Sequence, residues 1–263
     1  MQLTKGIITI AIGKKYVKQA IFLARSCILN TPNTIRAVIT DSPLVLKNYY
    51  DIILPWNNNN NYNIDPFSVK TRIYEFSPFD KTLFIDADSL VFHPIDEYWN
   101  YLEENNYVYE GDKLTNGEWY FDIKKTCQLV QTSWLPKFNS GMFLFKKSEE
   151  AKNIFDTAYY YFVNHKKEGI DIPFFRGKNY PDEPALSIAL AKHNIEPVID
   201  YGRFSRTLIK SKNIHLNIKK RIAFFLKNGK MVFPLIVHFC GRRNIPYYLR
   251  EKLRLFFIFK FNI

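Results

Sequence analysis

The stretch KTLFIDADSLVFHP, from Lys81 to Pro94, places an apolar strand directly before two carboxylates, Asp86 and Asp88. Side chains on an extended strand alternate between its faces, so both carboxylates of this Asp-x-Asp pair point to the same side. Ligands of open α/β sheets bind at such strand ends, and a divalent cation held by carboxylates is commonly completed by phosphate oxygens. The motif therefore predicts a metal that bridges the protein to a diphosphate. An aspartate that ends a strand also commonly caps a turn, so the pair alone leaves a structural role open.

The segments around this stretch predict strands that alternate with helices. A β-branched run marks Ile7 to Ile12 as a buried strand, and apolar residues at helical spacing predict a helix from Tyr16 to Leu29. Ile35 to Thr40 predicts a second strand, so the chain opens with a β-α-β unit, which normally gives a parallel sheet with a right-handed crossover. A cap at Asp65 and a first-turn proline predict a further helix that ends near Ser77.

The second half of the chain continues this alternation. Gly141 to Phe145 predicts a strand, and Ser148 is expected to cap a helix with a regular apolar face. Pro184 to Lys192 predicts a shorter helix, and closing strands are expected at Ile195 to Ile199 and at Pro234 to Phe239. The pattern predicts an α/β fold: a single Rossmann-like domain with three layers, α/β/α, around a mostly parallel central sheet.

Composition limits the class of protein. The 263 residues, 47% of them hydrophobic, suffice for one sizeable core. The three cysteines are odd in number, far apart and lack the close spacing of a zinc site, which favours a reducing, cytoplasmic environment. Lys14 and Lys15 end the first apolar run before it could form the core of a signal peptide. No segment approaches the roughly 20 apolar residues of a membrane span, so we expect a soluble protein or one peripheral to a membrane.

The net charge of +12 is concentrated in the last quarter of the chain. Residues 1–200 contain 22 Lys and Arg against 24 Asp and Glu, whereas residues 201–263 contain 15 against one. This asymmetry predicts a polyanionic partner for the last quarter, either phosphates, an anionic membrane surface or nucleic acid. A solvated basic face is the alternative.

Five pieces of the chain, in order and spacing, resemble the glycosyltransferases of family 8, which include glycogenin and bacterial lipopolysaccharide galactosyltransferases. The resemblance spans roughly residues 6 to 247. The pieces are Thr9 to Tyr16 with the helix that continues to Ser26, then Lys70, FIDADSLV, FNSG at Phe138 to Gly141, and DEPALS from Asp182, closed by HFCG at His238.

The resemblance implies a GT-A fold and transfer of a sugar, with retention, from a nucleotide-diphosphate donor, usually a UDP-sugar. It also implies a manganese-type divalent cation, and a glycan, glycolipid or protein as acceptor, with no nucleic acid partner. The transferase domain would cover residues 1–244, and residues 245–263 would form a basic, aromatic tail.

Asp86, Asp88 and His238 are the metal ligands that the resemblance implies. Two oxygens and one imidazole suit manganese better than magnesium, which prefers oxygen alone. Ala87 belongs to the same donor-binding segment, and Gly241 would let the chain turn tightly beside the diphosphate. A histidine packed in the core of a closing strand is the alternative for His238.

The remaining donor contacts come from segments far apart in the sequence. Tyr16 matches the position that stacks on uracil in the family, with Thr9 and Ile10 nearby on the strand end, although an aromatic near a helix start usually packs in the core. Lys70 would neutralise donor phosphate or touch the sugar; a solvated helix lysine is the alternative. Arg242 would supply a cation where the family often has a lysine that this chain lacks, although Arg243 could take that role.

Asn139, Asp182 and Glu183 are the catalytic candidates, and Ser140 and Gly141 accompany them in the donor-binding set. The Asn139 amide could bind sugar hydroxyls, but an Asn before Ser and Gly could equally form a turn. The family places a donor-sugar carboxylate at Asp182, which, just before Pro184, also has the character of a helix N-cap. The implied mechanism is electrostatic: cations absorb the negative charge that grows on the leaving phosphate.

Two other classes of function remain open from the residues. FIDADSLV also resembles the strand-end motif of haloacid-dehalogenase-like phosphatases, in which Asp86 would be the nucleophile. The basic last quarter could instead belong to a non-enzymatic protein that binds phosphates or nucleic acid.

The carboxyl tail, from Ile245 to Ile263, interleaves basic residues with aromatic and aliphatic ones. It is too short to span a bilayer, and we expect it to lie on an anionic membrane surface. The alternative is a terminal helix packed on the domain, since Leu253, Phe256 and Phe257 also form a plausible core stripe.

Overall fold

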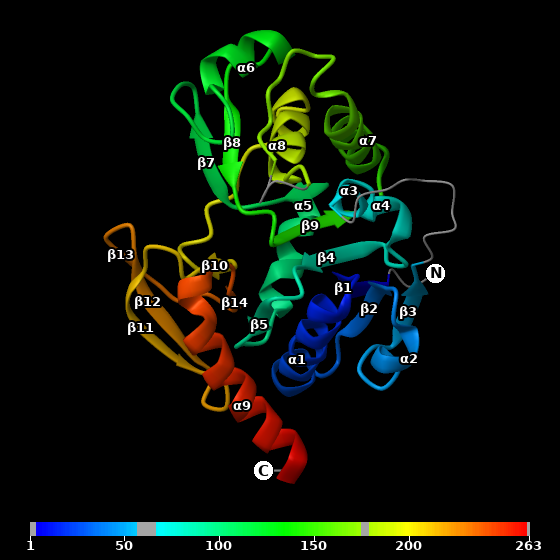
Figure 1. Cartoon of the computed structure of the whole chain (residues 1–263), viewed down its shortest axis with the longest axis vertical. Coiled ribbons are helices and arrows are strands. Elements are labelled where there is room, and N and C mark those ends of the chain that lie inside the picture. The colour runs from blue at the N-terminus through cyan, green and yellow to red at the C-terminus, as the bar shows by residue number, and fades with distance from the viewer. Residues whose placement is uncertain (1–3, 57–66, 175–178, 262–263) are drawn as a thin grey trace. The chain divides into compact units, whose positions relative to one another are not determined.

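The computed structural model describes residues 4–56, 67–174 and 179–261, so the predicted helix start at Asp65 lies outside the described residues. The chain forms two compact units that alternate along the sequence (Figure 1). Unit 1 contains Met1–Thr4, Asn57–Thr82 and Glu104–Ile199, and unit 2 contains Lys5–Trp56, Leu83–Glu103 and Asp200–Ile263. Each unit is therefore built from segments that are distant in sequence.

The β-α-β opening predicted from the sequence is present in unit 2. Strand β1 (Lys5–Ala11) pairs in parallel with β2 (Ile35–Thr40), and β2 pairs in parallel with β3 (Ile52–Pro55). Helix α1 (Lys14–Asn30) packs on β1, and its buried face includes the alanines and the cysteine expected from the helical spacing. β4 (Lys81–Ile85) lies next to β1 in the sheet. These pairings confirm the predicted α/β class with a mostly parallel central sheet.

A second, smaller sheet of unit 2 follows the Asp-x-Asp motif. Strand β5 (Ser89–Val91) pairs antiparallel with β14 (Ile236–His238), and β10 (Arg206–Thr207) pairs in parallel with β14. All six residues of β5 and β14 are buried. His238 lies directly opposite Ser89 in this pairing, so the sheet fixes the imidazole beside the two aspartates that precede β5.

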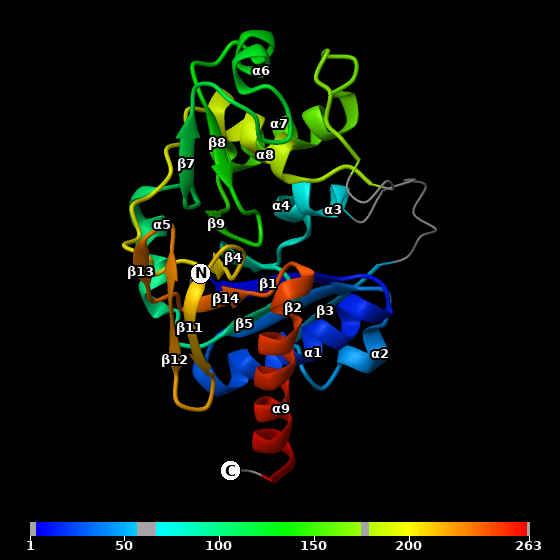
Figure 2. The same ribbon diagram turned by 60° about the vertical axis from the view of Figure 1, so that its left-hand side comes forward.

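The last quarter of the chain departs from the predicted alternation of strands and helices. β11 (Lys212–Asn217), β12 (Ile222–Lys227) and β13 (Lys230–Val232) form an antiparallel ribbon, which continues to β14 and to α9 (Ile245–Phe261). Figures 1 and 2 show α9 running beside this ribbon. The short elements that complete unit 2 are α2 (Pro43–Leu46), η1 (Asp96–Asn100), α5 (Tyr101–Glu104) and η2 (Arg242–Asn244).

The closing strand predicted at residues 195–199 is wrong. This segment has no ladder of strand hydrogen bonds: the Val198 N–H donates to the Tyr109 carbonyl, and Pro197 has no N–H to donate. Ile199 is exposed. An apolar, β-branched composition therefore did not suffice, because a strand also needs a ladder of backbone partners, and among the described residues this segment forms only single bonds of that kind.

Unit 1 carries the other predicted elements. β6 (Tyr107–Val108) pairs antiparallel with β9 (Met142–Lys146), and α7 (Glu149–Asn164) is capped by Ser148, whose hydroxyl accepts from the Ala151 N–H. The apolar face of α7 is buried as predicted, and α7 packs against α8 (Glu183–Lys192). The remaining elements are α3 (Ser68–Thr71), α4 (Ile73–Phe76), β7 (Gly111–Leu114), α6 (Ile123–Val130) and β8 (Leu135–Phe138), with β7 and β8 paired.

Helix α9 presents a narrow buried face and a broad exposed one. Tyr248, Glu251 and Leu255 form the buried face. The Glu251 carboxylate is fully buried; it accepts from the Ile218 N–H at 2.9 Å and from Arg250 Nε at 3.1 Å, and it also pairs with Arg254. Within the described residues, no helix is long and apolar enough to cross a membrane.

Glu251→Ala should lower the free energy of unfolding by about 3 kcal/mol, because it leaves a buried N–H unpaired and removes the counter-ion of two guanidinium groups. Urea denaturation followed by circular dichroism measures the change. Asp156→Ala, which breaks the exposed pair between Lys152 and Asp156, is the matched control and should leave the urea midpoint unchanged. An unchanged midpoint for Glu251→Ala would show that α9 does not stabilise the domain.

Candidate metal and substrate site

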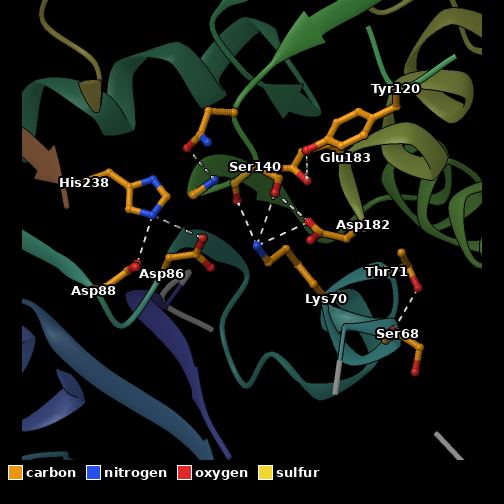
Figure 3. Close-up of polar contacts among 12 residues, drawn as sticks. Ser68, Lys70, Thr71, Asp86, Asp88, Tyr120, Ser140, Asp182, Glu183 and His238 are labelled. Atoms are coloured by element: carbon orange, nitrogen blue, oxygen red, sulfur yellow. Dashed lines mark hydrogen bonds and ion pairs between the residues drawn. The ribbon is translucent and has the colours of Figure 1, made fainter. Parts of the chain in front are cut away.

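Unit 2 brings together the three predicted metal ligands. One ligand atom from each of Asp86, Asp88 and His238 lies within 4.8 Å of the other two. His238 Nε2 is 2.9 Å from Asp88 Oδ1 and 3.8 Å from Asp86 Oδ2 (Figure 3). The imidazole is buried, whereas the carboxylates are about one-quarter and one-fifth exposed. We refer to these residues as the metal triad.

Backbone hydrogen bonds fix the geometry of the metal triad. The Ser89 N–H donates to the Asp86 carbonyl at 3.0 Å, which closes a tight turn between β4 and β5. The Phe239 N–H donates to the Asp88 carbonyl at 3.0 Å, directly after β14 ends at His238. The three side chains therefore converge because two strands distant in sequence end at the same point.

The ligand atoms of the metal triad fit a divalent transition-metal ion. Two carboxylate oxygens and one imidazole nitrogen form a mixed set that manganese accepts readily. The spacing allows all three to reach one ion, and a site with three protein ligands leaves positions for oxygens of a substrate or of water. Manganese accordingly fits both the residue types and their geometry.

Tyr16 is 40% exposed at the start of α1, so packing in the core does not explain this aromatic ring. The Lys15 ammonium lies 5.1 Å from its ring centroid. Just before α1, Gly13 has a φ of 92°, and its N–H donates to Asp41 Oδ2 at 2.8 Å. The strand end thus presents a fixed turn followed by an accessible aromatic ring.

The other donor-binding candidates of unit 2 differ in how accessible they are. Thr9 is fully buried in β1, and Ile10 beside it is partly exposed. Ala87 is buried between the two aspartates. Gly241 has a φ of 91°, a backbone conformation that favours glycine, and Arg242 after it is exposed. The chain therefore turns sharply just after the metal triad.

Unit 1 contains a buried charged cluster formed by Lys70, Ser140 and Asp182. Lys70 Nζ is 3.2 Å from Asp182 Oδ2 and 3.2 Å from Ser140 Oγ, and the Ser140 hydroxyl donates to Asp182 Oδ2 at 2.5 Å (Figure 3). All three residues are buried. The solvated-lysine alternative is therefore wrong for Lys70, because a buried ammonium requires such partners.

Asp182 occupies the N-cap position of α8 but makes no capping hydrogen bond through its side chain. Its carboxylate points instead toward Lys70 and Ser140. The side chain therefore does not act as the cap of this helix. Asn139 does form a local turn, since its Oδ1 accepts from the Gly141 N–H at 3.1 Å.

Tyr120 is a neighbour of the catalytic candidates that the sequence analysis missed. Its hydroxyl donates to Glu183 Oε2 at 3.3 Å. Burial raises the pKa of Tyr120, and the negative charges of Glu183 and Asp182 add to this increase, so the hydroxyl remains a neutral donor. The only sequence signal was the aromatic run Trp119 to Phe121, which has no periodicity to distinguish a site residue from a packing one.

Comparisons with known proteins identify a matching family and similar solved structures. The model of Glycosyl transferase family 8 matches residues 57–243. Among solved structures, the galactosyltransferase LgtC in complex with donor and acceptor sugar analogs is similar, with a TM-score of 0.61 and 15% sequence identity. The match covers 95% of this chain and 94% of that one. The structure of an active-site mutant of LgtC gives the same values. The apo structure of the bifunctional glycosyltransferase WbbM matches with a TM-score of 0.58 and 9% identity, over 97% of this chain and 52% of that one. No curated protein sequence matches the chain significantly.

His238→Ala should reduce Mn²⁺ affinity by more than about 100-fold. Mutation of a residue that only hydrogen-bonds a metal ligand typically costs about 10 to 100-fold in affinity, and the loss of a direct ligand should cost more. Titration of free Mn²⁺ by electron paramagnetic resonance measures the affinity. His215→Ala, which removes an exposed imidazole stacked on Phe224 in the same unit, is the control and should bind Mn²⁺ normally. Undiminished binding by His238→Ala would remove the imidazole from the ligand set.

Proposed function

Because the chain belongs to glycosyl transferase family 8 and is therefore a glycosyltransferase, we propose that it transfers a sugar from a UDP-sugar donor in a metal-dependent reaction that retains the anomeric configuration. The metal triad carries this proposal, since its two carboxylates and one imidazole lie close enough to hold one cation. The family membership removes the phosphatase and the non-enzymatic alternatives. We assign residues 1–244 to the transferase domain.

The metal triad would hold a divalent cation against the diphosphate of the sugar donor. The ligand atoms of the triad favour manganese. When bound, such an ion stabilises the negative charge that develops on the leaving diphosphate. Gly241 lets the chain approach this diphosphate closely, and the exposed Arg242 would add a second positive charge. The leaving phosphate oxygen can itself accept the proton of the acceptor hydroxyl, so the reaction needs no separate general base.

Tyr16 would stack on the uracil ring of the donor. Its exposure supports this role, since a large aromatic side chain that is 40% exposed retains a face for a ligand. Backbone groups of Thr9 and Ile10, at the end of β1, would bind the base edges. The buried side chain of Thr9 restricts its part to the backbone.

The Lys70–Ser140–Asp182 cluster would recognise the donor sugar. Its three side chains hold one another in fixed positions before any ligand binds, and such preorganisation lowers the entropic cost of binding. We assign to Glu183 the stabilisation of the positive charge that develops at the anomeric carbon, with Tyr120 orienting the carboxylate. Asn139, held in its turn by Gly141, would bind a sugar hydroxyl.

Glu183→Gln should lower the rate of Mn²⁺-dependent hydrolysis of the donor by about 100-fold with little change in the donor KM, because it removes charge stabilisation that matters only in the transition state. A panel of UDP-sugars, assayed without acceptor, identifies the donor and measures the rate. Glu118→Gln, at an exposed position in the loop before Tyr120, should behave as wild type. Absence of UDP-sugar hydrolysis across the panel, or wild-type rates for Glu183→Gln, would contradict the assignment.

The exposed face of α9 would place the enzyme on an anionic membrane that carries a lipid-linked acceptor. Leu249, Leu253, Phe256, Phe257 and Phe261 are exposed on this helix. Four cations accompany them against one buried glutamate, and each cation near an anionic surface contributes about 1 kcal/mol. The buried face of α9 packs on the domain, so the membrane and the packed alternatives describe two faces of one helix.

Wild-type protein should pellet with phosphatidylglycerol vesicles at low salt, and the double variant Leu253→Ala/Phe257→Ala should bind at least about tenfold more weakly, because apolar burial is lost. Leu129→Ala, on the exposed face of α6, is the control for removal of a surface leucine. The membrane proposal fails if wild-type protein stays in the supernatant at low salt.

A further inference from the structure

Tyr248, on the buried face of α9, has a hydroxyl that is buried and makes no hydrogen bond to the described residues. The residue is 8% exposed. Its ring centroid lies 5.1 Å from that of Phe239, the residue that follows the metal ligand His238. α9 therefore packs beside the strand that ends at the metal triad, and the Tyr248 hydroxyl has no partner among the described residues there.

Asp88 belongs to the part of the chain on which Tyr248 packs. Burial raises the pKa of Tyr248, and the negative charge of Asp88 raises it further. The backbone supports the same proximity, because the Phe239 N–H donates to the Asp88 carbonyl while the Phe239 ring packs on Tyr248. The Asp88 carboxylate thus contacts His238, and the Asp88 backbone accepts a hydrogen bond from the residue whose ring packs on Tyr248.

A buried hydroxyl without a partner destabilises a fold, since its hydrogen bonds to water are lost and not replaced. A phenylalanine would pack in the same place without that cost. Tyr107 has such a hydroxyl too, so the position of Tyr248, packed on the residue that follows His238, is what points to a partner gained in the metal-loaded protein. Carboxylates that ligate metals are commonly oriented by such hydrogen bonds from residues behind them.

We propose that Tyr248 is a positioning residue for the metal site: its hydroxyl donates to the Asp88 carboxylate, directly or through one water, when the cation is bound. The proposal rests on the metal dependence proposed above. It makes α9 part of the metal site, so the helix that would meet the membrane on its exposed face also supports a metal ligand on its buried face.

Tyr248→Phe tests the proposal, because it keeps the ring against Phe239 and removes only the hydroxyl. We expect Mn²⁺ affinity, measured by electron paramagnetic resonance, to fall about tenfold. We also expect the melting temperature in EDTA to stay equal or rise, since an unpaired buried hydroxyl is lost. Tyr107→Phe is the matched control: Tyr107, in unit 1, also has a buried hydroxyl without a partner among the described residues, and its loss should leave Mn²⁺ affinity unchanged.

Mn²⁺ binding by Tyr248→Phe within twofold of wild type overturns the proposal. An equal loss in Tyr107→Phe, or a lower melting temperature of Tyr248→Phe in EDTA, also overturns it, because a general packing effect then accounts for the weaker binding. If wild-type protein itself fails to bind Mn²⁺, the metal dependence falls together with the role of Tyr248. If His238→Ala loses Mn²⁺ while Tyr248→Phe retains it, the metal triad stands and only the positioning role is lost.

Discussion

Two like-charged carboxylates, Asp86 and Asp88, lie close together beside one imidazole, and much of the architecture of unit 2 serves to hold them there. Like charges at this distance repel, so a free loop would separate them. The turn between β4 and β5 and the antiparallel pairing of β5 with β14 prevent this separation. The strands are buried, and the backbone hydrogen bonds at their ends leave the side chains of the motif few alternatives to the convergent arrangement. A cation would relieve the repulsion that the fold imposes.

The same physical rule explains the buried cluster of unit 1. A lysine and an aspartate can be buried only as a pair with further hydrogen bonds, and Ser140 supplies those to both Lys70 and Asp182. This requirement directs the Asp182 carboxylate away from the backbone of α8, although the residue stands at the N-cap position. Charge pairing in a buried environment outweighs a capping bond, because an uncompensated buried charge costs more than an unsatisfied helix terminus that solvent or a backbone group can satisfy.

Helix α9 shows how a terminal segment can serve two environments. The sequence pattern alone does not show which face of α9 packs on the domain, since both faces contain large hydrophobic side chains. The structure resolves the ambiguity through Glu251, the only acidic residue of the last quarter, which is buried and bonds the Ile218 backbone. Leu253, Phe256 and Phe257, the core stripe of the packed-helix alternative, are exposed, and the residues that pack are Tyr248, Glu251 and Leu255.

The sequence by itself determined the class of fold, the β-α-β opening and the helices α1, α7 and α8, and it indicated the three residues of the metal triad. The fold and the Asp-x-Asp pair follow from local rules, since strands and helices have characteristic periodicities and such a pair at a strand end points to one side. His238 followed only from the family resemblance. Only the tertiary structure decided which polar residues pair when buried, as for Lys70 with Asp182 and Tyr120 with Glu183. It also decided that residues 195–199 are not a strand and that the last quarter folds as an antiparallel ribbon. Strand formation and the pairing of buried charges both depend on partners distant in sequence, and no local pattern contains that information.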